Sequence, residues 1–237
     1  MPRVLLFCLL LGCAFQLQAQ QLVKTFDSGL WTGLKIDYKL KNNFKLVFMQ
    51  DLRLSDNFSK LNKVNTDLGV QYKINKNFKL ATNIRYSYNL RKLNLYSHDL
   101  RMNYDLGLKI KIVENLKLRY RLRFQHAYIT EFNFSGYGYN GIESNLRNKL
   151  QFDYSIEDHQ IYLNAELFRE MKPSRLAFFN QMRFILGSKW KNKLGEFNYA
   201  LAYERELGKA NPLNYVFLKL YYTFEFEQKI KNKRTKK

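Results

Sequence analysis

Apolar and polar residues alternate along most of the chain from residue 28 onward. Segment 116–124 shows the pattern most clearly, with apolar residues at even positions and basic residues at odd ones. The two sets are Leu116, Leu118, Tyr120, Leu122 and Phe124 against Lys117, Arg119, Arg121 and Arg123. A strand separates alternate residues onto opposite faces, whereas a helix would mix them on every face. The pattern therefore predicts an all-β fold.

The alternation predicts eleven long strands when it is followed along the whole chain. Most of them are long enough to cross a membrane as tilted strands, which takes about nine to eleven residues. Their connections alternate between tight turns, near 41–43, 75–77, 113–115, 157–159 and 191–195, and longer loops. This alternation is typical of outer-membrane barrels, whose short turns face the periplasm. The predicted strands lie near 29–41, 44–55, 63–74, 78–90, 96–111, 116–129, 143–156, 160–169, 175–190, 196–206 and 213–227.

The number of strands matters for closure, because single-chain bacterial barrels have an even number. Segment 20–27 has Leu22 and Phe26 at even positions, which would place them on one face of a strand, and it is barely long enough to supply a twelfth strand. We therefore expect a transmembrane, antiparallel, up-and-down β-barrel of about twelve strands over residues 20–227, with ten strands as the alternative. A soluble β-sandwich or lipocalin-like barrel fits less well, because its apolar parity would have to fill a small interior.

Residues 1–19 have the composition of a cleaved signal peptide. Arg3 precedes an apolar run at 4–15, and Ala19 marks the expected cleavage site. In an alternative interpretation, the sequence LLGC is a lipoprotein box that would leave Cys13 acylated. Both cysteines lie in this segment, so the secreted chain would have no thiol for disulfides, zinc ligation or catalysis. No later apolar run reaches about 18 residues, so any membrane crossing is expected to use strands.

Aromatic residues make up 16% of the chain and gather where the predicted strands meet the short turns. Aromatic rings at the ends of the strands match the girdle that outer-membrane barrels place at the membrane interface. We therefore expect the bacterial outer membrane as the location, and its lipid and lipopolysaccharide as the partners. The aromatic residues in question are Tyr38, Phe44, Tyr72, Phe78, Tyr154, Trp190 and Phe197.

The formal net charge of +20 would suggest a nucleic-acid partner for a cytosolic protein. The predicted signal peptide argues against that partner, so none is expected. Part of the excess lies in the basic tail at 228–237, which we interpret as a solvated periplasmic segment rather than a binding arm.

The polar residues of the alternating pattern face the lumen of the predicted barrel. Their charges are unevenly distributed around it. Buried charges have to be paired, so one interpretation is a structural network that fills the lumen of an envelope protein. The alternative is a narrow anion-favouring pore or small-solute transporter, in which the basic wall meets water. Twelve strands leave little room between long side chains, which favours the structural interpretation. The basic residues are Arg101, Lys117, Arg119, Arg121, Arg123, Arg147 and Lys149, and their expected acidic partners are Asp99, Asp105, Asp153, Glu166 and Glu204.

Candidate catalytic residues are few, and we expect no enzyme. A remote alternative is an outer-membrane lipid hydrolase, which would need a hydroxyl beside an oriented imidazole. His98 and His126 fall on the lipid-facing parity, but no serine lies two residues from either, and His159 lies in a tight turn. The sequence has no metal-ligand cluster, phosphate loop or nucleotide fingerprint, so no cofactor is expected.

The most distinctive predicted loop is 131–142, with the sequence EFNFSGYGYNGI. We interpret it as a flexible loop with an aromatic collar, and a surface recognition site is the alternative. The sequence names no protein partner for it.

Three segments of the chain resemble a known family, the uncharacterised Bacteroidetes barrel proteins grouped as domain-of-unknown-function 2490. They are GLWTGLKIDYKLKNNFKL, DLGVQYKINKNFKLATNIRYSY, and ESNLRNKLQFDY at 143–154. The resemblance covers most of the chain after the signal peptide and implies an outer-membrane barrel. It brings no catalytic or ligand-binding residues.

Overall fold

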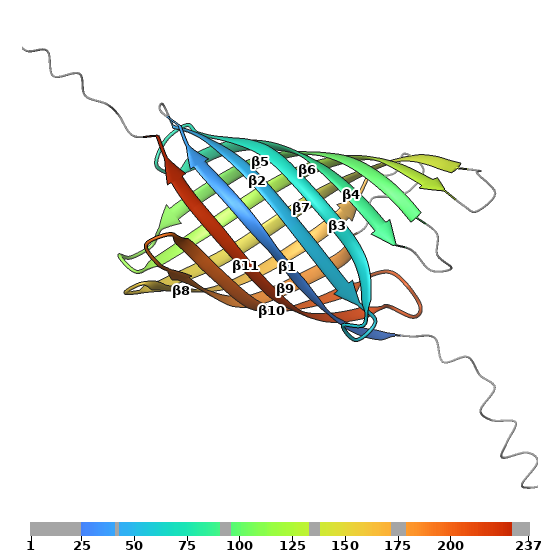
Figure 1. The fold of residues 1–237 in the computed structure, drawn as a ribbon. Coiled ribbons are helices and arrows are strands. Elements are labelled where there is room, and N and C mark those ends of the chain that lie inside the picture. The colour runs from blue at the N-terminus through green and yellow to red at the C-terminus, as the bar shows by residue number, and fades with distance from the viewer. Residues whose placement is uncertain (1–24, 41–42, 91–95, 133–137, 172–178, 229–237) are drawn as a thin grey trace, which may run out of the picture.

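The computed structural model describes residues 25–40, 43–90, 96–132, 138–171 and 179–228. These residues form a closed barrel of eleven strands, each next to its neighbour in sequence (Figure 1). The predicted barrel is confirmed. The strands are β1 (Phe26–Lys39), β2 (Phe44–Ser55), β3 (Lys60–Lys73), β4 (Phe78–Leu90), β5 (Tyr96–Lys111), β6 (Leu116–Phe132), β7 (Gly138–Ile156), β8 (His159–Glu170), β9 (Phe179–Lys191), β10 (Gly195–Glu206) and β11 (Asn214–Glu227).

The two parities of the sequence become the two faces of the barrel wall. Apolar side chains on the outside are exposed, with Leu34 at 54% and Leu163 at 53%. Polar side chains face inward, and Asp51 and Asp153 are both fully buried at 0%. The interior of this barrel is therefore polar and its exterior apolar, the reverse of a soluble protein core.

The expected twelfth strand is not seen in the described part of the chain, where there are eleven strands. Phe26 and Asp27, from the segment expected to supply it, are instead the first residues of β1, and 20–24 lie outside the described residues. With eleven strands the first and last run in the same direction. β1 and β11 accordingly pair in parallel, from Phe26 opposite Asn214 to Lys39 opposite Glu227. A parallel ladder pairs backbone groups on both strands, so it closes the barrel without an open edge.

The connections define two ends of the barrel. At the turn end, connections 40–43, 74–77, 112–115, 157–158 and 192–194 join the strands, and β11 ends there. The opposite end, the loop end, is where β2, β4, β6, β8 and β10 end and where β1, β3, β5, β7, β9 and β11 begin, so the first and last strands place the two described termini at opposite ends (Figure 1).

One loop-end connection is tighter than expected. Asp56, Asn57 and Phe58 all have positive φ, between 54° and 68°. The buried carboxylate of Asp27 accepts hydrogen bonds from the backbone N–H groups of Asp56 at 3.1 Å and Asn57 at 3.3 Å. These bonds hold a left-handed backbone that non-glycine residues rarely adopt.

The predicted loop at 131–142 is also shorter than expected, because β6 continues to Phe132 and β7 already begins at Gly138. Most residues of the predicted loop therefore belong to the paired strands β6 and β7. The predicted signal peptide and the possible lipidation site Cys13 lie outside the described residues, as does the predicted basic tail from residue 229 onward. No helix in the described ranges is long and apolar enough to cross a membrane.

Candidate functional site in the barrel lumen

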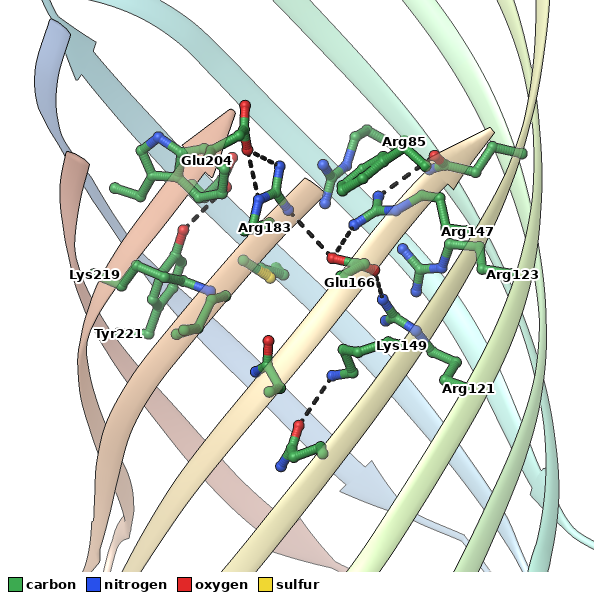
Figure 2. A pocket seen from close by; sticks show the side chains of 18 of the residues that line it. Arg85, Arg121, Arg123, Arg147, Lys149, Glu166, Arg183, Glu204, Lys219 and Tyr221 are labelled. Carbon is green, nitrogen blue, oxygen red and sulfur yellow. Dashed lines mark hydrogen bonds and ion pairs between the residues drawn. The ribbon is translucent and has the colours of Figure 1, made fainter. Parts of the chain in front are cut away.

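A cavity of about 1020 Å³ occupies the lumen. Its lining extends from Glu206 and Lys209 at the loop end to Lys45 and Glu225 near the turn end. Fifteen basic and nine acidic side chains line it, so the cavity carries an excess of positive charge. Figure 2 shows part of this lining, in which arginines from neighbouring strands converge on Glu166.

Glu166 of β8 is the centre of the lumen network. Its carboxylate accepts a hydrogen bond from Arg121 Nη2 at 2.6 Å, and its second oxygen lies 2.8 Å from Arg147 Nη2 and 3.4 Å from Arg183 Nη1. Arg183 also donates from Nε to Glu204 at 2.5 Å. One buried acid therefore holds three guanidinium groups from β6, β7 and β9. Charges buried in this way are stable only while they remain paired.

Other arginines of the lumen are held by acids on adjacent strands. Arg123 donates to both oxygens of Asp105, at 2.5 and 2.6 Å. Arg85 makes the same bidentate contact with Asp67, at 2.8 and 2.7 Å. Bidentate pairs fix the plane of the guanidinium group as well as its position. The basic residues at alternate positions of these strands are therefore held in fixed orientations inside the barrel.

The remaining predicted residues are also brought to the lumen, with different surroundings. Arg119 Nε lies 2.7 Å from Asp153 Oδ2, and Lys149 donates to Gln151 at 3.1 Å. Arg101 lines the cavity, and Asp99 accepts a hydrogen bond from Asn89 at 2.7 Å. Lys117 is half-buried at the turn end, opposite Asp153 in the β6–β7 register.

The expected pairing of the basic residues with Glu166 and Glu204 is only partly seen. Arg121 on β6 reaches past β7 to Glu166 on β8, but Glu204 on β10 is bound by Arg183 of β9, a residue that the sequence analysis did not single out. Arg183 could have been identified from its position, because it shares odd parity with Gln181 and Ile185 along a predicted strand.

We call the lumen face of β4 to β7 the cation wall and that of β8 to β11 with β1 the aromatic wall. In the aromatic wall, Tyr162, Ile185, Ala200, Ala202 and Phe217 form a buried apolar cluster. The ring of Trp31 stacks on Phe217 at 3.9 Å between centroids. The guanidinium carbon of Arg53 lies 3.8 Å from the Trp31 ring, a cation–π contact.

His98 and His126 lie on the outer face, as expected, whereas His159, expected in a tight turn, is the first residue of β8. His126 has a partner that the spacing within its own strand could not reveal. His126 Nδ1 lies 3.0 Å from Ser144 Oγ, because the β6–β7 register places the two residues directly opposite each other. Among the described residues no carboxylate or amide orients His126 through a hydrogen bond. His98 Nδ1 lies 2.5 Å from Tyr86 Oη, and His159 stacks on Trp190. The described ranges also contain no cluster of histidine, cysteine, aspartate and glutamate suited to a metal ion.

Comparison with known proteins gives one match. The model of a family described as "Protein of unknown function (DUF2490)" matches residues 28–211, which include ten of the eleven strands in whole or in large part. No curated protein and no solved structure matches the chain. The family match covers most of the chain, as the resemblance implied, and this protein therefore belongs to the DUF2490 family.

Proposed function

We propose that this protein spans the outer membrane of a bacterium as a β-barrel, and that its lumen provides a narrow path that favours small anions. The observation that carries the membrane location is the apolar outer face. Large apolar side chains are exposed on every strand, including Leu68, Leu100, Leu150, Leu186 and Leu201.

Lipid is the environment in which such a surface is stable. Soluble proteins rarely expose contiguous apolar patches above a few hundred Å². A barrel with alternating apolar-out and polar-in residues buries that surface in the bilayer and keeps its backbone hydrogen-bonded within the ladder. The predicted signal peptide supports the same location.

Refolding into phospholipid vesicles tests the membrane location. We expect the protein to insert from urea and to resist protease over the strands, whereas without lipid or detergent it should aggregate. The variant Leu163→Arg places a charge on the outer face within β8 and should lower the stability in vesicles by about 2–4 kcal/mol. The matched variant Leu194→Arg lies in a turn-end connection, so it should have little effect. A barrel that is monomeric and folded without lipid or detergent would contradict the proposal.

The lumen cavity favours an anion path over a purely structural interior. The ion-pair network does not fill the lumen, because a volume of about 1020 Å³ stays open between lining residues of both ends. The excess of basic over acidic lining residues lowers the energy of an anion inside and raises that of a cation. Conductance recorded from single barrels in a planar bilayer tests the path. Discrete steps are expected, and a lumen that never conducts would favour the structural role.

A further inference from the structure

We propose that the lumen contains a binding site for a small solute with two or more clustered negative charges, phosphoryl groups being the best match. The site is formed by five cations of β4, β6 and β7, which we call the junction cluster: Lys79, Arg119, Arg121, Arg123 and Lys149. This inference names the solute class for the proposed anion path and rests on that proposal for its physiological purpose.

The junction cluster lies where two cavities meet. A second cavity of about 380 Å³ opens at the turn end, on the side of β3 to β7. It shares seven lining residues with the main lumen cavity, namely the five cations of the junction cluster together with Gln71 and Gln151. No carboxylate is among the shared residues. A solute that moves between the two cavities would therefore meet only cations and amides there.

The strand register brings three of these cations into one row across β4 to β7. Lys79 is opposite Gly107, Gly107 is opposite Arg121, and Arg121 is opposite Lys149. A Cβ at Gly107 would lie 2.7 Å from Lys79 Cε and 2.8 Å from Lys79 Cγ. The missing side chain thus leaves the space in which Lys79 lies across β5 toward Arg121.

Like charges face each other along the cation wall in a way that disfavours folding. Between β4 and β7, five cross-strand positions pair two cations directly. Directly opposed like charges destabilise a sheet. Local rules of this kind are broken mostly at functional sites. A bound anion would relieve the repulsion. The pairs are Arg85 with Arg101, Lys109 with Arg119, Lys111 with Lys117, Arg121 with Lys149, and Arg123 with Arg147.

The cations of the junction cluster are also held in place for a ligand. The three arginines each contact one acid, Arg119 with Asp153, Arg121 with Glu166 and Arg123 with Asp105. The buried Nε of Arg121 has no hydrogen-bond partner among the described residues. Lys79 and Lys149 have no carboxylate within ion-pair distance in the described part of the chain, so their charges remain to be neutralised.

The geometry selects the class of solute. Planar guanidinium groups bind phosphoryl and carboxyl oxygens with paired N–H donors, and lysines add point charges. A monovalent ion such as chloride would neutralise only one of these charges. The volume of about 380 Å³ suits a small organic or inorganic solute. Among such solutes, one with several anionic oxygens would satisfy the most donors.

Calorimetric titration of the purified barrel in detergent tests the site, with inorganic pyrophosphate as the probe. We expect saturable binding, and neutralisation of one cation by Lys149→Gln or Lys79→Gln should weaken it roughly tenfold or more. Neither substitution leaves an unpaired acid among the described residues, so both variants should fold. The titration is repeated with citrate, which distinguishes carboxylate from phosphoryl recognition, and with chloride, which is expected to show no saturable binding.

The matched control is Lys219→Gln on the aromatic wall. Lys219 also lines the main cavity and has no carboxylate partner among the described residues, but it lies outside the junction cluster. Pyrophosphate binding should persist in this variant. Equal losses in all three variants would indicate a diffuse positive field and overturn the site, as would the absence of saturable binding.

This experiment separates the site from the proposed path. Binding is measured without a membrane, so a barrel that binds pyrophosphate but never conducts would refute the path alone. A barrel that conducts anions without saturable binding would refute the site alone.

Discussion

The cation wall and the aromatic wall arise from the same alternating pattern but have different interiors. On the aromatic wall, small residues such as Ala200 and Ala202 leave room for the rings of Tyr162 and Phe217, which pack as in a protein core. On the cation wall, long basic side chains lie next to one another, and acids such as Asp105 and Asp153 pair with only some of them. Packing stabilises the first wall, whereas the second depends on paired charges.

The difference shows how one barrel can combine a close-packed half with a half lined by charges. Alternation alone decides which residues face inward. The size and charge of those residues then decide whether the interior packs or stays open. The two walls meet between β7 and β8, where Arg147 of the cation wall lies 2.8 Å from Glu166 of the aromatic wall.

The largest effect is expected at this meeting point. Glu166→Gln removes the acid that holds three guanidinium groups and should lower the free energy of unfolding by about 3–5 kcal/mol. Urea unfolding in vesicles measures it. Glu206→Gln is the control, because Glu206 contacts the exposed Lys209, and such pairs contribute only about 0–1 kcal/mol. Similar stability in the two variants would show that the network is not structural.

An intermediate effect is expected from overpacking the aromatic wall. Ala202 is fully buried at 0% exposure, and Ala202→Leu should destabilise the barrel by about 1–3 kcal/mol. Leu201→Ala on the outer face of the same strand serves as the comparison, since it faces away from the cluster. If Ala202→Leu is neutral, the aromatic wall is not close-packed.

A smaller loss is expected when the aromatic contacts of Trp31 are removed. Trp31→Leu keeps an apolar side chain but loses the stacking on Phe217 and the contact with Arg53, together about 1–2 kcal/mol. Trp190→Leu, at the outer face of the turn end, provides the matched substitution and should cost less. Equal effects of the two variants would argue that no special packing surrounds Trp31.

The smallest effect has the opposite sign and is specific to the cation wall. Lys149→Gln removes a charge directly opposite Arg121 and should raise stability by about 0.2–1 kcal/mol in the absence of a bound anion. Lys189→Gln should instead lower stability, because Lys189 lies 2.7 Å from Glu196. Thermal unfolding of both variants checks the contrast, and a loss of stability in Lys149→Gln would contradict the view that its charge is unneutralised.

The sequence predicts much of this fold because the barrel wall is a local pattern. All eleven strands could be located within a few residues, since each carries its own alternation. The closing pair could not be predicted, because alternation within β1 or β11 says nothing of which strand lies beside it. An even count was expected because single-chain bacterial barrels have an even number of strands, and the structure instead closes eleven strands by pairing β1 with β11 in parallel.

The lumen residues were predictable as a set but not as partners. Parity placed Arg121 and Glu166 inside, yet their contact spans 45 positions in the sequence and depends on the register of three strands. The contact of His126 with Ser144 was missed for the same reason, because residue spacing within β6 does not reveal which residue of β7 lies opposite. Gly107 gave no signal of its own, since its role depends on Lys79 lying across it.

If the barrel spans a membrane as proposed, its lumen presents an excess of positive charge to passing solutes. The most direct test is the reversal potential of single barrels in a planar bilayer that separates two concentrations of potassium chloride. We expect a reversal potential of the sign that marks preferential chloride passage, reduced when Lys79 and Lys149 are both changed to Gln. A reversal potential of the opposite sign, which marks preferential potassium passage, would contradict it.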